Sequence, residues 1–227
     1  MRHARSVALT VAVVAFMMAA TAWVRTAPRG ESAGLHMTIL GKTIPGQLPD
    51  FILFLLPATT ALVGLVFATL PTIARMQGAL SRSTLAYMLV WHGVLATLLA
   101  LHLILLAGVM GTGIDIVRAC VVVSGALLVV VGNYLPKVRL NPVFGVRTPW
   151  TVRNERVWDR THRVVGTWLV AAGGIAILGG WLFQDRLFAV MSLLLPALAA
   201  AIAAIVYSAV ISPGPTGPTH KILRDDR

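Results

Sequence analysis

The chain has few charged residues and one cysteine, and each shortage excludes a class of protein. Of its 227 residues 12% are charged, against roughly 25% in soluble domains, so a water-soluble fold could not cover its surface. The single cysteine, Cys120, excludes an internal disulfide framework, and its apolar neighbours favour a packing role over a reactive thiol. A hydrophobic content of 57% excludes a disordered chain. These shortages leave a polytopic membrane protein.

The chain contains six apolar runs instead, each long enough for a membrane-spanning helix of about 20 residues. The runs are continuously apolar, whereas the strands of a membrane barrel alternate over about 10 residues. The sequence therefore predicts an all-α, polytopic membrane bundle with six transmembrane helices, at residues 7–24, 51–70, 85–110, 116–135, 164–183 and 187–211. The first run also ends in a small-residue pattern typical of a signal-peptide cleavage site, but its length favours an uncleaved span.

Lysine and arginine are distributed unevenly over the loops between these runs. Fourteen of the nineteen lie on the side of the N-terminus, four lie on the other side, and Arg118 lies within a span. Because cytoplasmic loops are enriched in these residues, we expect both termini in the cytoplasm. The formal charge of +11 is then explained by basic cytoplasmic segments, and direct nucleic-acid binding is not needed to account for it.

The polar residues concentrate in one predicted cytoplasmic segment, residues 132–166, between the fourth and fifth spans. Here Asn154 is a candidate N-cap for a helix that continues into span five. Along that helix Asp159 is spaced to pair with Arg156 or Arg163. The sequence as a whole divides into an N-terminal two-span region with an aperiodic external loop, a four-span region and a flexible cytoplasmic tail, at residues 1–84 (loop 25–50), 85–211 and 212–227.

Three short motifs follow one another in this segment: NYLPK at 133–137, GVRTPWT at 145–151 and VWDRTHR at 157–163. Their order and spacing resemble the signature of the SdpI family, bacterial integral membrane proteins named for an immunity protein against a secreted toxic peptide. The resemblance is dense over residues 132–166, hereafter the signature segment. It implies a six-span protein of the plasma membrane that protects its cell from a toxic antimicrobial peptide. It also implies signalling, in which the protein recruits a cytoplasmic transcriptional repressor to the membrane when toxin is present.

The resemblance also identifies candidate binding residues for such partners, which would be a toxic peptide on the external or intramembrane side, a cytoplasmic repressor and membrane lipids. A second interpretation of the same residues stays open, in which they form a structural staple that joins spans four and five. The candidates are Asn133, Pro136, Lys137, Asn141, Gly145, Arg147, Thr148, Pro149, Trp150, Glu155, Trp158, Thr161, His162 and Arg163.

Three ionisable residues lie inside the predicted spans. His92 and His102 in span three could serve a proton relay, but the span interiors offer no acidic partner, which favours neutral, packed histidines. Arg118 lies one turn into span four, where it is expected to extend outward and anchor the interface beside Asp115.

Catalytic and metal-binding motifs are missing from the sequence. It contains no HExxH, GxSxG or Walker motif and no pair of carboxylates placed for acid–base catalysis, and His162 has no second metal ligand nearby. We therefore expect a binding protein without enzymatic activity, cofactor or metal. The alternatives are a small secondary transporter or exporter, which would need charged residues in its spans or an inverted repeat, and a structural subunit of a membrane complex.

Overall fold

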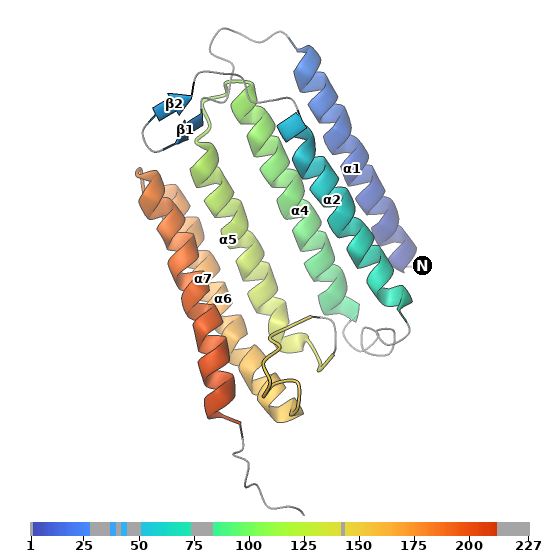
Figure 1. The fold of residues 1–227 in the computed structure, drawn as a ribbon, viewed down its shortest axis with the longest axis vertical. Coiled ribbons are helices and arrows are strands. Elements are labelled where there is room, and N and C mark those ends of the chain that lie inside the picture. The colour runs from blue at the N-terminus through green and yellow to red at the C-terminus, as the bar shows by residue number, and fades with distance from the viewer. Residues whose placement is uncertain are drawn as a thin grey trace, which may run out of the picture.

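Six long helices run up and down along one axis in the computed structural model (Figure 1). This confirms the predicted all-α membrane bundle. The structure describes residues 2–27, 37–39, 42–44, 51–73, 84–141 and 144–212. The predicted cytoplasmic tail and most of the loop at 25–50 lie outside the described residues. The long helices are α1 (Arg2–Thr26), α2 (Phe51–Thr69), α4 (Thr84–Val109), α5 (Ile116–Tyr134), α6 (Glu155–Leu182) and α7 (Arg186–Val210), with short 3-10 turns η1 (Leu70–Thr72) and η2 (Leu135–Lys137).

All six helices are long and apolar enough to cross a bilayer, with mean hydropathies of 1.7 to 2.5. Large apolar side chains remain exposed along them, among them Leu62 on α2 and Trp181 on α6. Such a surface suits a lipid environment, because exposing this much apolar area to water is unfavourable.

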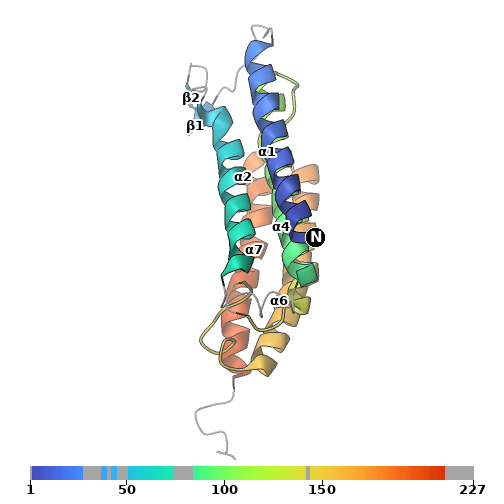
Figure 2. The same cartoon turned by 90° about the vertical axis from the view of Figure 1, so that its right-hand side faces the viewer.

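The helices form two sets of three. Helices α1, α2 and α4 pack on one another, as do α5, α6 and α7, and the contact between α4 and α5 joins the two sets. The two orthogonal views show that α1 begins and α7 ends at the same end of the bundle, where the loop between η2 and α6 also lies (Figures 1 and 2). We call this the loop end.

A short β-hairpin was not expected from the sequence. Strands β1 (Met37–Ile39) and β2 (Lys42–Ile44) pair antiparallel, with Thr38 opposite Thr43. They lie within the loop that joins α1 to α2, at the end of the bundle opposite the loop end (Figure 1). The hairpin adds two three-residue strands to the all-α bundle without changing its class.

Helices α5 and α6 approach each other closely at two pairs of glycines. A Cβ atom on Gly132 would lie 2.6 Å from the carbonyl oxygen of Gly166, and one on Gly125 would lie 2.8 Å from that of Gly173. On each helix the two glycines are seven residues apart, which is two turns or about 10.5 Å. The repeat therefore keeps one face of α5 against one face of α6 over much of the span, as small residues do in membrane bundles.

A methyl group at this interface should cost stability. We expect Gly132→Ala to lower the free energy of unfolding by about 1–3 kcal/mol, because the added Cβ has to push the two backbones apart. Gly174→Ala is the matched control, since a Cβ at that position meets no atom within 4 Å. Thermal unfolding in detergent measures both; equal midpoints for the two variants would contradict the close contact.

Candidate functional site

Helix α6 begins where the sequence predicts. The side chain of Asn154 accepts hydrogen bonds from the amides of Arg156 and Val157, at 2.9 and 3.3 Å, which confirms the predicted N-cap. A capped helix start satisfies amide groups that have no partner within the helix. It thereby fixes the first turns of α6, which carry Trp158 and His162.

The imidazole of His162 fastens the loop to α6. Its Nε2 accepts a hydrogen bond from the amide of Val146 at 3.0 Å, and its Nδ1 lies 2.8 Å from the carbonyl oxygen of Trp158. A nitrogen that accepts carries no proton, so the proton is on Nδ1, which donates to the carbonyl. His162 is thus a neutral, fully buried ring with both nitrogens engaged inside the fold.

Trp158, one helical turn before His162, also holds the loop against α6. Its indole lies against the imidazole of His162, with ring centroids 4.0 Å apart, and its Nε1 donates to the carbonyl oxygen of Val138 at 2.8 Å. Gly145 passes directly over both rings with a φ of +118°, and a Cβ there would lie 2.9 Å from the indole. Only glycine combines that backbone conformation with that approach.

A cluster of hydroxyl groups joins the loop to α7. Thr151 donates from its Oγ1 to the carbonyl oxygen of Val146 at 2.8 Å, and Thr148 donates from its Oγ1 to Oγ of Ser208 at 3.0 Å. All three hydroxyl side chains are buried. Sequence reasoning did not identify Ser208, whose only signal is a hydroxyl in an apolar run.

The predicted site residues divide by exposure into two groups. Asn141 organises its own turn, since its Oδ1 accepts from the amide of Phe144 at 2.9 Å and its Nδ2 donates to the carbonyl oxygen of Arg139 at 2.8 Å. Thr161 is buried, with no hydrogen-bond partner for its hydroxyl among the described residues. The buried group is Asn141, Thr148, Trp158, Thr161 and His162; Trp150 is partly buried; the exposed group is Asn133, Pro136, Lys137, Gly145, Arg147, Pro149, Glu155 and Arg163.

The exposed arginines of α6 lie on one face of the helix. Arg156, Arg160 and Arg163 follow one another at spacings of four and three residues, and all are exposed. Within the described part of the chain none of them forms a salt bridge. The prediction that Asp159 pairs with Arg156 or Arg163 is wrong: the Asp159 carboxylate lies 3.8 Å from the guanidinium of Arg139 in the loop. We call these three residues the arginine row.

The predicted pairing of the Arg118 side chain with Asp115 is also wrong. Its guanidinium reaches the end of α6, where Nε donates to the carbonyl oxygen of Gly180 at 3.0 Å and Nη2 to that of Trp181 at 2.6 Å. The last carbonyls of a helix have no partner within it and carry partial negative charge, so they attract a cation.

Asp115 consequently has a different arginine partner. Its carboxylate lies 3.0 Å from the guanidinium of Arg186, and it accepts the amide hydrogen of Arg118 as the N-cap of α5. Burial of the carboxyl opposes its ionisation, but the two hydrogen bonds and the charges of Arg118 and Arg186 together lower the pKa of Asp115 below its ordinary value. The pair ties the starts of α5 and α7 together at the end opposite the loop end.

The histidines of α4 both face α1. His92 Nε2 lies 3.0 Å from Oγ of Ser6, and His102 Nε2 lies 3.1 Å from Oγ1 of Thr21 and 3.2 Å from the carbonyl oxygen of Met17. These contacts fit the expectation of neutral histidines packed between helices. In the described ranges no three His, Cys, Asp or Glu side chains lie close enough to hold a metal ion.

Comparison with known proteins locates the resemblance in the same part of the fold. The fold and the loop define a multi-pass helical membrane protein with a basic, internally fastened segment between its fourth and fifth spans. Residues 137–208 match the SdpI/YfhL protein family. Over these residues the chain is similar to that family, and it is a multi-pass protein of the bacterial plasma membrane.

One curated protein is similar to part of the chain. The chain is 30% identical over 70 residues to a protein named Immunity protein SdpI from Bacillus subtilis (strain 168). The similar region is 31% of this chain and 34% of the relative, so the chain covers about a third of the length of the relative that it matches. No solved structure matches the chain with statistical significance.

His162 gives a test of the fastened loop. Replacing it by Phe keeps a buried ring but leaves the amide of Val146 and the carbonyl of Trp158 without their partner. We expect His162→Phe to lose about 1–3 kcal/mol of stability, the cost of unpaired buried groups, and to open residues 144–151 to proteolysis. Arg163→Gln, exposed and adjacent, should behave like the unaltered protein. Thermal unfolding and limited proteolysis provide the measurement, and unchanged protease resistance of His162→Phe would count against the fastening.

Proposed function

We propose that this protein confers immunity on its cell against a toxic antimicrobial peptide. The observation that carries the proposal is the match of residues 137–208 to the SdpI/YfhL protein family, together with 30% identity over 70 residues to a protein named as an immunity protein. The similar region includes the fastened loop and both helices that hold it. Because the segment is fixed by buried hydrogen bonds on α6 and α7, it can present its exposed residues in one constant arrangement.

The mechanism that we propose is binding without bond chemistry. The toxic peptide would meet the protein on its external or intramembrane surface. The loop end would face the cytoplasm, as the distribution of lysine and arginine favours. There the arginine row, together with the exposed Arg147 and Arg153, would offer a basic surface to an acidic patch on a cytoplasmic repressor.

Protection itself is tested by deletion and challenge. Cells that lack this gene should become sensitive to the antimicrobial peptides that they or neighbouring strains secrete, and a plasmid copy should restore survival. Complementation with Gly145→Val should fail, because the side chain would collide with Trp158 and His162 and release the loop. Complementation with Gly174→Ala should succeed, since that position has free space. Deletion without any change in sensitivity would contradict the proposed immunity.

Signalling is tested separately through the arginine row. We expect Arg156→Gln, Arg160→Gln and Arg163→Gln combined to preserve protection but to abolish the toxin-dependent rise in transcription from the gene's own promoter. The three side chains are exposed, so their loss removes a binding surface without unfolding the loop. Glu155→Gln, exposed on the first turn of the same helix, serves as the control. A promoter reporter provides the readout, and an unaltered response in the triple variant would contradict recruitment by this row.

A further inference from the structure

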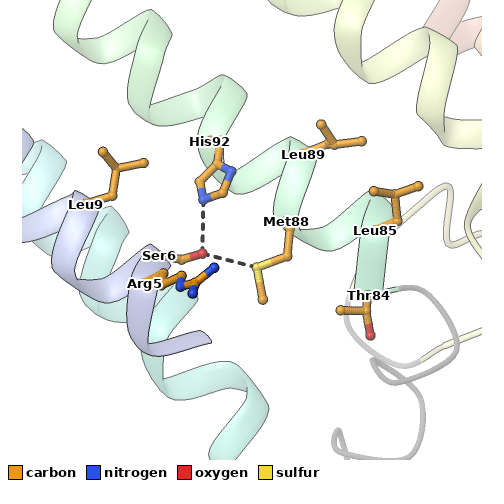
Figure 3. Close-up of a pocket in the computed structure, with 8 residues that line it drawn as sticks. All are labelled: Arg5, Ser6, Leu9, Thr84, Leu85, Met88, Leu89 and His92. Atoms are coloured by element: carbon orange, nitrogen blue, oxygen red, sulfur yellow. Dashed lines mark hydrogen bonds between the residues drawn. The ribbon is translucent and has the colours of Figure 1, made fainter. Parts of the chain in front are cut away.

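A groove of about 360 Å³ lies between the first turns of α1 and α4, outside the region that matches the SdpI family. Figure 3 shows the two helices facing each other across it, with Ser6 and His92 meeting between them. Leu9 and Leu85 on its rim are 45% and 62% exposed, so the groove opens sideways toward lipid. Its principal lining residues are Arg5, Ser6 and Leu9 from α1 and Leu85, Leu89 and His92 from α4.

The groove combines a cation with apolar walls. Arg5 is exposed and forms no salt bridge within the described residues. Leu9, Leu85 and Leu89 supply hydrocarbon surface along its length. From the start of α4 to His92 is eight residues, or about 12 Å along the helix axis, which is enough to hold part of an extended acyl chain. A ligand that matches this lining is an amphiphile with a negatively charged head.

The three helices of the N-terminal set offer no anion to Arg5. Helices α1, α2 and α4 contain no Asp or Glu. In the sequence before α5 the acidic residues are Glu31, Asp50 and Asp115, which lie between α1 and α2 or immediately before α5 along the chain. Because α1 and α4 both begin at the loop end, the positive ends of their dipoles add to the charge of Arg5. A negatively charged ligand would therefore complement the charge of Arg5.

His92 supplies a polar contact below the charged mouth. Its Nε2 lies 3.0 Å from Oγ of Ser6, and its Nδ1 has no hydrogen-bond partner among the described residues. The single hydroxyl hydrogen of Ser6 goes either to Nε2 or to Sδ of Met88, which lies 3.3 Å away, and in both cases Nδ1 of His92 is left to bond a ligand. A phospholipid carries ester carbonyl acceptors and, with a glycerol headgroup, hydroxyl donors, so its polar part can bond Nδ1 in either tautomer.

We propose that this groove binds one anionic phospholipid from the adjoining leaflet. The phosphate lies against Arg5, the polar part of the lipid bonds Nδ1 of His92, and an acyl chain lies along Leu9 and Leu89. A phospholipid held there packs α1 against α4 at the loop end, in the half of the bundle that the SdpI match does not cover.

The test uses the full-length protein in detergent micelles, with native mass spectrometry to count bound lipids. Phosphatidylglycerol is the anionic probe and phosphatidylcholine the neutral one. Arg5→Gln should weaken phosphatidylglycerol binding about fivefold, the effect of one arginine near a phospholipid surface, and should leave phosphatidylcholine binding unchanged. Arg25→Gln, at the other end of the same helix, is the matched control and should bind like the unaltered protein.

A second variant tests the groove as a space. Leu89→Trp fills the apolar wall and should displace the lipid, while the thermal unfolding midpoint reports whether the bundle is intact. Equal binding of the two lipids by the unaltered protein would overturn the proposal, as would undiminished phosphatidylglycerol binding by Arg5→Gln. If Leu89→Trp fails to fold, the Arg5→Gln result alone tests the proposal. The Arg5 side chain is exposed, so replacing it leaves the packing of the bundle unaltered.

Discussion

Backbone contact between α5 and α6 is the constraint on which the C-terminal half depends. Where Gly132 meets Gly166 and Gly125 meets Gly173, no side chain separates the helices, so van der Waals packing acts at its shortest range. This contact fixes how α6 is rotated relative to α5. It thereby decides that Trp158 and His162 face the loop that follows η2, while the arginine row faces away.

The polar signature consequently serves two purposes with two sets of residues. Buried members such as Asn141 and His162 spend their hydrogen bonds on backbone groups of the loop, in the manner of a structural staple. Exposed members such as Arg147 and Arg163 contribute nothing to that fastening and are available to a partner. The two interpretations of the segment therefore apply to different residues within it, since a buried, fully bonded imidazole has no group left to offer to a ligand.

The sequence predicted the elements of this fold better than their contacts. Hydropathy located every long helix, and Asn154 marked the start of α6, because these signals are local. The partners of Arg118 and Asp159 were predicted wrongly, since spacing along one helix cannot show that the end of α6 lies beside Arg118 or that Arg139 reaches back over Asp159. The role of Ser208 required the register between the loop and α7, which no single segment encodes.

The joint between α4 and α5 has a consequence for how this protein can vary. Substitutions at sites that share no contacts add independently in their effect on stability. The loop is held by α5, α6 and α7 and also packs on the start of α4 through Ala86 and Tyr87. Among the described residues, α1 and α2 pack mainly on each other and on α4, so changes on their outward faces leave the loop unstrained. A chain built in this way can exchange the lipid-facing surface of its first half while the second half stays the same. Helices α1 and α2 are thus the part of the fold in which related membrane proteins can diverge without disturbing the loop that α4 to α7 hold.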